Sequence, residues 1–303
     1  MTPLRSLPVL LCLAVLIALA GYGWSVTSYK RNLWPIPTLR AAFGAGETVL
    51  PQVGTEDAVG RLVSFPGKVA VPCPAQTADT AVLFVIGQSN AANHAGTRIT
   101  TRHPQRVLNV FEGKCYAAAS PLLGATGEGG EFLTLVGDKL VDDGAYKTVM
   151  ILESAVTDSP ISRWRRDGDL NEAALATLKT LPAGYKVTHV IWHQGENDLR
   201  YKTSTKVYRE SFLSLLATLR ETGVAAPVFL AVATTCGDSR GPGNPVAEAQ
   251  RALVDDKTIF LGADTDALVG DADRRDRCHF TEAGQRKTAL SYAAAIEKAR
   301  RPQ

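Results

Sequence analysis

Two short segments far apart in the chain carry the residue types that a serine hydrolase needs. Ser89 lies in the sequence GQSN (residues 87–90), directly after an apolar run, and Asp276 and His279 stand three positions apart near the C-terminus. Serine is a poor nucleophile at neutral pH and needs a base to take its proton. A histidine serves as that base when a carboxylate holds its tautomer and stabilises the imidazolium. One short turn can present both Asp276 and His279, so we predict that they act together on Ser89.

Each of these residues has a plainer interpretation. A serine after a strand is more often a helix cap than a nucleophile, and the α/β-hydrolase elbow has glycine where this chain has Ala91. His94 sits in a polar loop, where solvent exposure is the simpler expectation. His189 and His193 lie on one expected strand, about 13 Å apart, which is too far to share one metal ion. We therefore expect neither a metal nor any other cofactor.

A polar cluster, WHQGEND (residues 192–198), follows another expected strand. Buried amides and acids at such a density are expensive to leave without partners, so a structural network is one interpretation. The other is an oxyanion hole, in which Asn197 or Gln194 donates to the negative charge that develops on the substrate. Gly129 or Gly130 is expected to add a backbone N–H, because glycine permits close approach.

Alternating strand and helix signals predict how these residues are held. Short apolar runs, as expected for strands covered on both faces, occupy residues 81–86, 106–111, 148–152, 187–192, 228–233 and 258–261. Helical signals lie between them: an apolar stripe over 208–219, a capped start at Asn244-Pro245, and a last segment over about 281–299. This pattern predicts an α/β fold, a three-layer α/β/α sandwich around a mostly parallel, doubly wound sheet. Ligands gather at the carboxyl ends of such strands.

Composition narrows the class of protein. The chain has 303 residues, a hydrophobic fraction of 45% and a net charge of +3, which are ordinary values for a globular protein. It lacks a basic stripe with interleaved aromatic residues, so we expect no nucleic-acid partner. We divide it into an N-terminal segment (1–26), a proline- and glycine-rich stalk or lead-in (27–79) and a C-terminal α/β domain that carries the candidate catalytic residues (80–303). The oligomeric state stays open.

The N-terminal segment predicts export. Residues 7–20 form an apolar run after Arg5, and Ala18-Leu19-Ala20 fits a signal-peptide cleavage site. The run can be extended to about the 20 residues that span a bilayer, with Tyr22 and Trp24 at the interface. A buried core helix is the alternative. We favour an uncleaved single-pass anchor, with the domain on the periplasmic side of the inner membrane, over a cleaved signal and secretion.

Four cysteines lie in the part of the chain expected to be exported. Sequence alone allows three pairings among them, and we prefer two disulfides, Cys73 with Cys115 and Cys236 with Cys278. The second disulfide would brace the loop that carries His279. Free buried thiols are the alternative interpretation. No paired C-x-x-C is present, so a zinc site is not expected.

The motifs together resemble the SGNH (GDSL-type) hydrolase superfamily, and more narrowly its sialate O-acetylesterase and carbohydrate esterase family six branch. The resemblance covers roughly residues 80–300 and rests on GQSN, WHQGEND and DRCHF (residues 276–280) in that order. It implies that Ser89 is the nucleophile and that Asp276 and His279 complete a triad. It also implies an oxyanion hole made of the Ser89 N–H, Gly129 or Gly130, and Asn197. Supporting or substrate-contacting roles are expected for Gln88, Asn90, Gln194, Glu196 and Trp164.

The expected activity is removal of acetyl or other short acyl groups from a carbohydrate or polysaccharide through an acyl-enzyme. An O-acetyltransferase that passes the acyl group to a sugar hydroxyl would use the same residues. A catalytically silent glycan-binding domain is the alternative from another class, and covalent labelling by a fluorophosphonate separates it from an enzyme. The expected partners are an acetylated carbohydrate and, through the N-terminal segment, a membrane.

Overall fold

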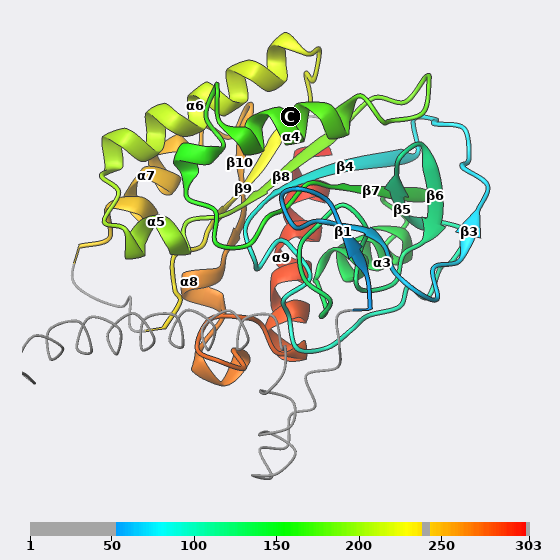
Figure 1. Cartoon of the computed structure of the whole chain (residues 1–303), viewed down its shortest axis with the longest axis horizontal. Helices are drawn as coiled ribbons and strands as arrows, with labels where there is room; N and C mark the ends of the chain where they lie inside the picture. Colours follow the sequence, from blue (N-terminus) through cyan, green and yellow to red (C-terminus); the bar gives the residue numbers. More distant parts are fainter. Residues whose placement is uncertain (1–52, 238–242, 301–303) are drawn as a thin grey trace, which may run out of the picture. The chain divides into compact units, whose positions relative to one another are not determined.

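The computed structural model describes residues 53–237 and 243–300, and a mixed sheet of eight strands lies at their centre. The strand order is β10-β9-β8-β4-β7-β5-β6-β3, and helices cover both faces (Figure 1). Neighbouring strands from β10 to β5 are parallel, whereas β6 and β3 join the edge antiparallel. The expected three-layer α/β/α architecture with a mostly parallel sheet is confirmed.

All six expected strands are present. They are β4 (Thr80–Gly87), β5 (Val107–Phe111), β7 (Thr148–Glu153), β8 (His189–His193), β9 (Val228–Val232) and β10 (Ile259–Asp264). The sequence pattern did not predict the remaining described strands. They are the antiparallel edge strands β6 (Lys114–Ala117) and β3 (Ala70–Val71), and the separate pair β1 (Thr55–Glu56) and β2 (Leu62–Ser64). These strands have two to four residues and are partly exposed, so they lack the continuous apolar run that marks a buried strand.

The helices divide between the two faces of the sheet. On one face lie α3 (Leu133–Asp142) and α9 (Glu282–Arg300); on the other lie α4 (Asp169–Leu178), α6 (Thr205–Glu221) and α7 (Pro245–Leu253). Four shorter elements, α5 (Glu196–Arg200), α8 (Thr265–Leu268), η1 (Ile161–Arg163) and η2 (Asp271–Asp273), occupy connections between the larger ones. Of these helices, the sequence pattern had predicted α6, α7 and α9.

Local chemistry explains where two of the predicted helices begin. Ser204 accepts a hydrogen bond from the Val207 N–H at the start of α6, at 3.3 Å. Asn244 does the same for Ala247 at the start of α7, at 2.9 Å, and Pro245 takes the first helical position. Both residues thus satisfy an N–H that has no partner within its own helix.

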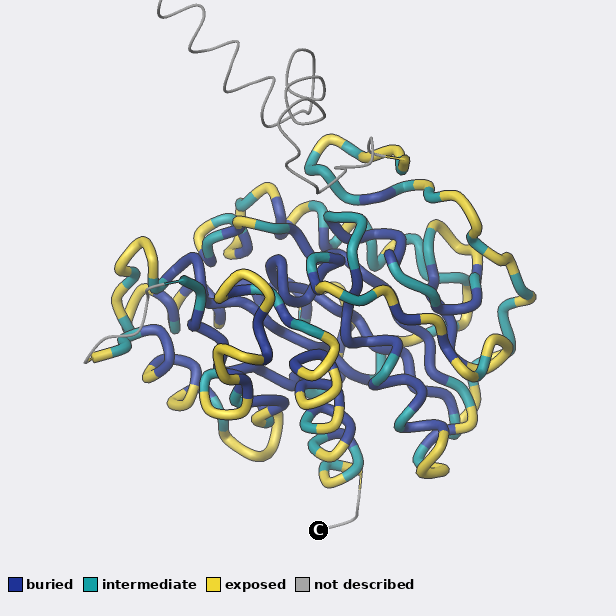
Figure 2. Tube along the Cα trace, turned by 90° about the horizontal axis from the view of Figure 1, so that it is seen from below, coloured by how far each residue is buried: buried dark blue, intermediate teal, exposed yellow. Residues whose placement is uncertain are grey.

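The central strand β4 separates two hydrophobic cores. All eight of its residues are buried; Leu83 and Val85 belong to the core under α3 and α9, and Val82 and Phe84 to the core under α6 and α7. Figure 2 shows the buried residues in the interior of the chain trace and the exposed residues along its outer turns. Burial on both faces is what the apolar run of this strand requires.

The described part of the lead-in, residues 53–79, packs on the sheet. Its strand β3 pairs with β6, and a disulfide joins Cys73 to Cys115 on β6, in the expected pairing. Arg61 donates hydrogen bonds to Ser154 at 2.7 Å and to Thr177 at 2.9 Å. These residues therefore share a sheet and a polar network with the domain that follows them.

The expected signal or anchor, residues 1–26, lies outside the described residues. Within the described ranges, no helix combines the length and the apolar character needed to cross a bilayer.

Candidate active site

Ser89 stands in a tight turn directly after the central strand. Gly87 ends β4 with φ +145°, and a Cβ at this position would lie 2.1 Å from the His193 carbonyl oxygen on β8, so only glycine fits. Ser89 is 4% exposed, yet it lines a cavity at the carboxyl ends of the strands. Neither its N–H nor its hydroxyl has a hydrogen-bonding partner among the described residues. Both groups are therefore available to a ligand.

Asp276 and His279 form a hydrogen-bonded pair within one turn. The His279 Nδ1 lies 2.7 Å from Asp276 Oδ2, and Asp276 Oδ1 accepts the N–H groups of Cys278 at 3.0 Å and His279 at 2.7 Å. The carboxylate therefore fixes both the turn and the ring. With its proton on Nδ1, His279 has Nε2 available as a base.

The electrostatics of Asp276 suit this pairing. Burial raises the pKa of Asp276, but the hydrogen bonds from the His279 ring and backbone and from Cys278 outweigh it and hold the pKa at about 2. The carboxyl group is thus ionised throughout the neutral range, as a group that stabilises an imidazolium must be.

One cavity of about 720 Å³ brings the expected residues together. Ser89, Asp276 and His279 line it, and so do Gln88, Glu196 and Asn197. The three sequence motifs thus meet at the carboxyl end of the sheet, where parallel α/β folds bind their ligands.

Asn197 is a further residue that lines the cavity. It lies in the first turn of α5, and the N–H groups of Asn197 and of Gly195, the residue before this helix, donate to Gln88 Oε1 at 3.3 and 3.4 Å. The side-chain amide nitrogen of Asn197 is buried and has no hydrogen-bonding partner in the described part of the chain. A buried donor without a partner is costly unless a ligand satisfies it.

The expected glycine donors do not fit the site. The Gly129 N–H donates to the Asn93 carbonyl at 2.7 Å and the Gly130 N–H to the Ala95 carbonyl at 2.8 Å. Neither glycine lines the cavity. Their lack of side chains serves close backbone approach instead, because a Cβ on Gly130 would lie 1.8 Å from the Thr97 carbonyl oxygen. The prediction of a free oxyanion N–H at these two positions is corrected accordingly.

The rest of the polar cluster is a structural network. Gln194 donates to the Ser159 carbonyl at 3.0 Å and to the Asp198 carboxylate, and it accepts from the Tyr208 hydroxyl at 2.9 Å. Asp198 also accepts the Ile161 N–H at 2.7 Å. Of the two interpretations of this cluster, the structural one therefore fits Gln194, whereas the Asn197 amide nitrogen is among the buried atoms that have no partner in the described part of the chain.

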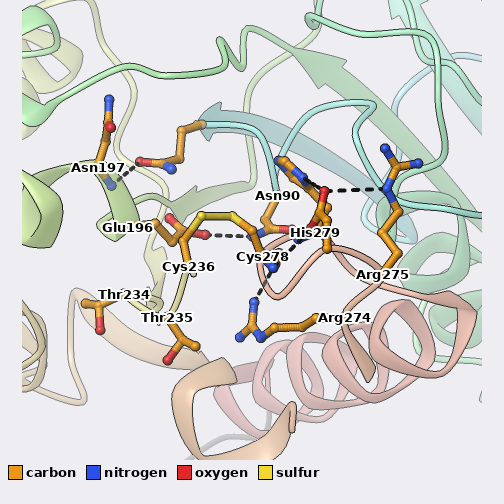
Figure 3. Close-up of a disulfide and its surroundings, with 12 residues drawn as sticks. Asn90, Glu196, Asn197, Thr234, Thr235, Cys236, Arg274, Arg275, Cys278 and His279 are labelled. Carbon is orange, nitrogen blue, oxygen red and sulfur yellow. Dashed lines mark hydrogen bonds and ion pairs between the residues drawn. A yellow bond between two sulfur atoms is a disulfide. The ribbon is translucent and has the colours of Figure 1, made fainter. Parts of the chain in front are cut away.

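Asn90 and Glu196 form a buried bridge between all three motifs. The Asn90 amide donates to Glu196 Oε1 at 2.7 Å and to the Cys278 carbonyl at 3.3 Å, which joins the serine turn to α5 and to the histidine loop (Figure 3). Burial raises the pKa of Glu196 to about 7, against the lowering effect of the Asn90 hydrogen bond. The two side chains therefore connect the three motifs, and their supporting role in the reaction stays a prediction.

The second disulfide, between Cys236 and Cys278, also forms in the expected pairing and lines the cavity (Figure 3). Cys278 lies between Asp276 and His279, so the bond anchors the loop that carries both to the segment after β9. The Gly237 N–H adds a backbone hydrogen bond to the Arg277 carbonyl at 3.0 Å.

Trp164 has a structural rather than a ligand-contacting position. It is fully buried, its ring nitrogen donates to the Ser159 hydroxyl at 3.0 Å, and it packs edge-on against Trp192. Substrate contact is thereby excluded for this side chain, which supports the loop before it. Thr157 and Asp158 of that loop line the cavity directly.

His94 belongs to the site, although its polar loop had suggested solvent exposure. Its ring stacks on the His279 ring with centroids 5.5 Å apart and planes 28° from parallel. No spacing rule links residues 94 and 279, so only a three-dimensional view reveals the contact. Among the described residues no group of three potential metal ligands gathers.

Comparison with known proteins gives the class of protein to which this fold and cavity belong, a carboxylic ester hydrolase. The family model described as carbohydrate esterase, sialic acid-specific acetylesterase matches residues 79–298, and the chain belongs to this family. No curated protein sequence matches the chain.

Two solved structures are similar in fold. A protein from Arabidopsis thaliana has 18% sequence identity and a TM-score of 0.57, and NanS has 17% identity and a TM-score of 0.51. Each match covers 72% of this chain and 97% of the other chain. At these identities the likeness establishes the shared fold.

Proposed function

We propose that this protein removes O-acetyl groups from a carbohydrate through a Ser89–His279–Asp276 triad and an acyl-enzyme. The observation that carries the proposal is the convergence of Ser89, the Asp276-paired His279 and the unpartnered Asn197 amide on one cavity. Membership of a carbohydrate esterase family supports the substrate class. The sialic acid in the family's description is said of that family, and the sugar on which this chain acts stays unassigned.

In the first half-reaction His279 Nε2 takes the proton of the Ser89 hydroxyl as Oγ attacks the ester carbonyl carbon. A tetrahedral intermediate forms, with the former carbonyl oxygen as an oxyanion. When it collapses, the bond to the sugar oxygen breaks and His279 returns the proton to that oxygen. The products are the free sugar hydroxyl and acetyl-Ser89.

The oxyanion needs donors that are already in place. Ser89 and Asn197 both line the cavity, and the Ser89 N–H and the Asn197 side-chain amide have no other partners within the described chain. Donors that need no rearrangement stabilise the developing charge most effectively. We therefore assign the oxyanion hole to these two groups.

Water completes the reaction. His279 takes a proton from a water molecule as its oxygen attacks acetyl-Ser89, a second tetrahedral intermediate forms, and acetate leaves as Ser89 recovers its proton. Asp276 stays ionised in both halves, because its pKa of about 2 lies far below neutral pH.

The cavity suits a sugar. Its volume of about 720 Å³ falls within the usual range for small-molecule sites. Its rim carries exposed polar side chains that can hydrogen-bond to hydroxyl groups, namely Asp158, Arg200 and Lys202. We also propose that the protein is exported, on the basis of the apolar N-terminal run and the two disulfides, which persist in oxidising compartments.

Acetate release from a panel of O-acetylated sugars and polysaccharides tests the function. The Ser89→Ala variant is expected to lose at least about 1000-fold in kcat, while Ser214→Ala, a serine on α6 outside the cavity, keeps wild-type activity. Circular dichroism checks that both variants fold. A folded Ser89→Ala enzyme that retains more than a few per cent of activity contradicts the proposal.

A further inference from the structure

The face of the His279 ring is covered by another histidine that the triad does not use. His94 stacks on it with a centroid separation of 5.5 Å and an interplanar angle of 28°. Asp276 holds the edge of the His279 ring through Nδ1, but one hydrogen bond leaves the ring free to tilt about it. The stack supplies a second constraint, perpendicular to the first.

We propose that His94 is a positioning residue for His279, which holds the plane of the imidazole so that Nε2 faces Ser89. This inference rests on the proposed function and assigns His94 no direct role in proton transfer.

His94 is itself held in place by a hydrogen-bond chain. The Thr157 N–H donates to Thr126 Oγ1 at 2.9 Å, so the Thr126 hydroxyl hydrogen is available for His94 Nε2, 3.2 Å away. This chain fixes the orientation of the His94 ring and ties it to the loop that lines the cavity.

The backbone leaves room for the His94 ring where a side chain would otherwise stand. A Cβ on Gly127 would lie 2.7 Å from His94 Nε2 and 2.6 Å from the Asn93 carbonyl oxygen, and Gly127 has φ +87°. Glycine is therefore required at this position, both for its backbone conformation and for the space it leaves. Gly127 precedes Gly129 and Gly130, the two glycines expected at the oxyanion hole, and it contributes instead to the packing of His94.

The charge state of His94 suits a ring that packs against a base. Burial lowers the pKa of His94 to about 3, and the nearby positive charges of His279 and Arg275 act in the same direction, against Asp276. His94 is therefore uncharged throughout the neutral pH range. A neutral ring lets His279 become an imidazolium during the reaction without repulsion from its neighbour.

Three substitutions separate the effect of the His94 ring from the effect of its hydrogen bond to Thr126. His94→Ala removes both, His94→Phe keeps a flat ring and loses the bond to Thr126, and His94→Gln keeps a polar atom and loses the ring. Steady-state hydrolysis of p-nitrophenyl acetate gives kcat and KM, and thermal unfolding reports folding. We expect His94→Ala to lower kcat about 10- to 100-fold with KM changed less than about twofold, because misorientation of a base affects the chemical step.

An aromatic ring at position 94 is expected to preserve kcat even without the hydrogen bond to Thr126. His94→Phe should stay within about threefold of the wild-type kcat, and His94→Gln should be as slow as His94→Ala. A His94→Ala enzyme with wild-type kcat, or a His94→Phe enzyme as slow as His94→Gln, overturns the proposal. If His94→Ala does not fold, the comparison of Phe with Gln decides alone.

Ser89→Ala, measured beside these variants, separates a failure of the proposed function from a failure of the positioning role of His94. An active Ser89→Ala enzyme refutes the proposed function itself. An inactive Ser89→Ala enzyme together with unimpaired His94 variants refutes the positioning role only.

Discussion

The candidate site is organised around groups that are held in place and left without partners. The Ser89 hydroxyl, His279 Nε2 and the Asn197 amide nitrogen have no hydrogen-bonding partner among the described residues. Leaving buried polar groups unpaired lowers stability. Such an arrangement is expected where a substrate or a transition state supplies the missing partners.

Removal of the Asn197 amide is predicted to slow the chemical step. Asn197→Ala should lower kcat about 100- to 1000-fold with little change in KM, because the amide acts on charge that develops in the transition state. Asn197→Asp has nearly the same shape but places a carboxylate near the oxyanion, so it should be at least as slow. Rates of acetate release check both. Variants within about threefold of wild type contradict the oxyanion role.

At the residue scale, sequence reasoning identified groups whose neighbours are close in sequence. Asp276 and His279 share one turn, so their contact could be predicted from their spacing. The His94–His279 contact joins segments far apart in the chain, and the Gly129 N–H already donates a hydrogen bond to the Asn93 carbonyl. Both depend on how separate loops pack, which residue types alone do not specify.

At the scale of elements, the two disulfides make a natural comparison. Each links cysteines 42 residues apart, so each restricts the unfolded chain to a similar extent. Only the Cys236–Cys278 bond lines the cavity. The two bonds should therefore contribute alike to stability and differently to activity.

Paired serine substitutions test this difference. Removal of either bond is expected to lower the free energy of unfolding by about 4 kcal/mol. The Cys236→Ser/Cys278→Ser variant should also lose at least about tenfold in kcat, because it frees the loop that holds Asp276 and His279. The Cys73→Ser/Cys115→Ser variant should keep its kcat. Equal activity in the two folded variants contradicts the bracing role.

A clear hydrophobic pattern, either a continuous apolar run or an apolar stripe, determined which elements could be predicted. The six core strands are apolar runs, and α6 shows a clear apolar stripe through Tyr208, Phe212 and Leu215. The helix α4 begins after Gly168 without a side-chain cap, and α5 is a single turn. The edge strands β3 and β6 are short and half exposed. Tertiary packing rather than local pattern specifies such elements.

At the scale of the whole molecule, a buried acid makes stability depend on pH. The pKa of Glu196 in the folded protein is about 7, above its ordinary value of 4.5. Between these values the folded state holds a proton that the unfolded state releases. The contribution of Glu196 to stability is therefore lost as pH rises from about 4.5 to 7.

The Glu196→Gln variant should remove this dependence. Its amide oxygen can still accept the hydrogen bond from Asn90, and it carries no charge at any pH. Relative to wild type, its free energy of unfolding in urea should rise by about 3 kcal/mol between pH 4.5 and pH 8. If the free energies of unfolding of the variant and the wild type differ by the same amount throughout this pH range, Glu196 does not have a raised pKa in the folded protein.

The arrangement of the whole domain was predictable because alternating strands and helices permit few topologies. The strand order that brings β4 and β8 side by side was not specified in advance, and it is this adjacency that places the GQSN turn against WHQGEND. The histidine loop arrives from beyond β10, at the far edge of the sheet. Its position depends on the Cys236–Cys278 bond and on the bridge through Asn90.

The central claim is that Ser89 is the residue that becomes acylated, with His279 as its base. Reaction of the full-length protein with a fluorophosphonate, followed by peptide mass mapping, tests it directly. We predict a single phosphonylated site at Ser89, none in Ser89→Ala, and strongly slowed labelling in His279→Ala. Modification of another serine, or labelling of Ser89→Ala at the wild-type rate, contradicts the account.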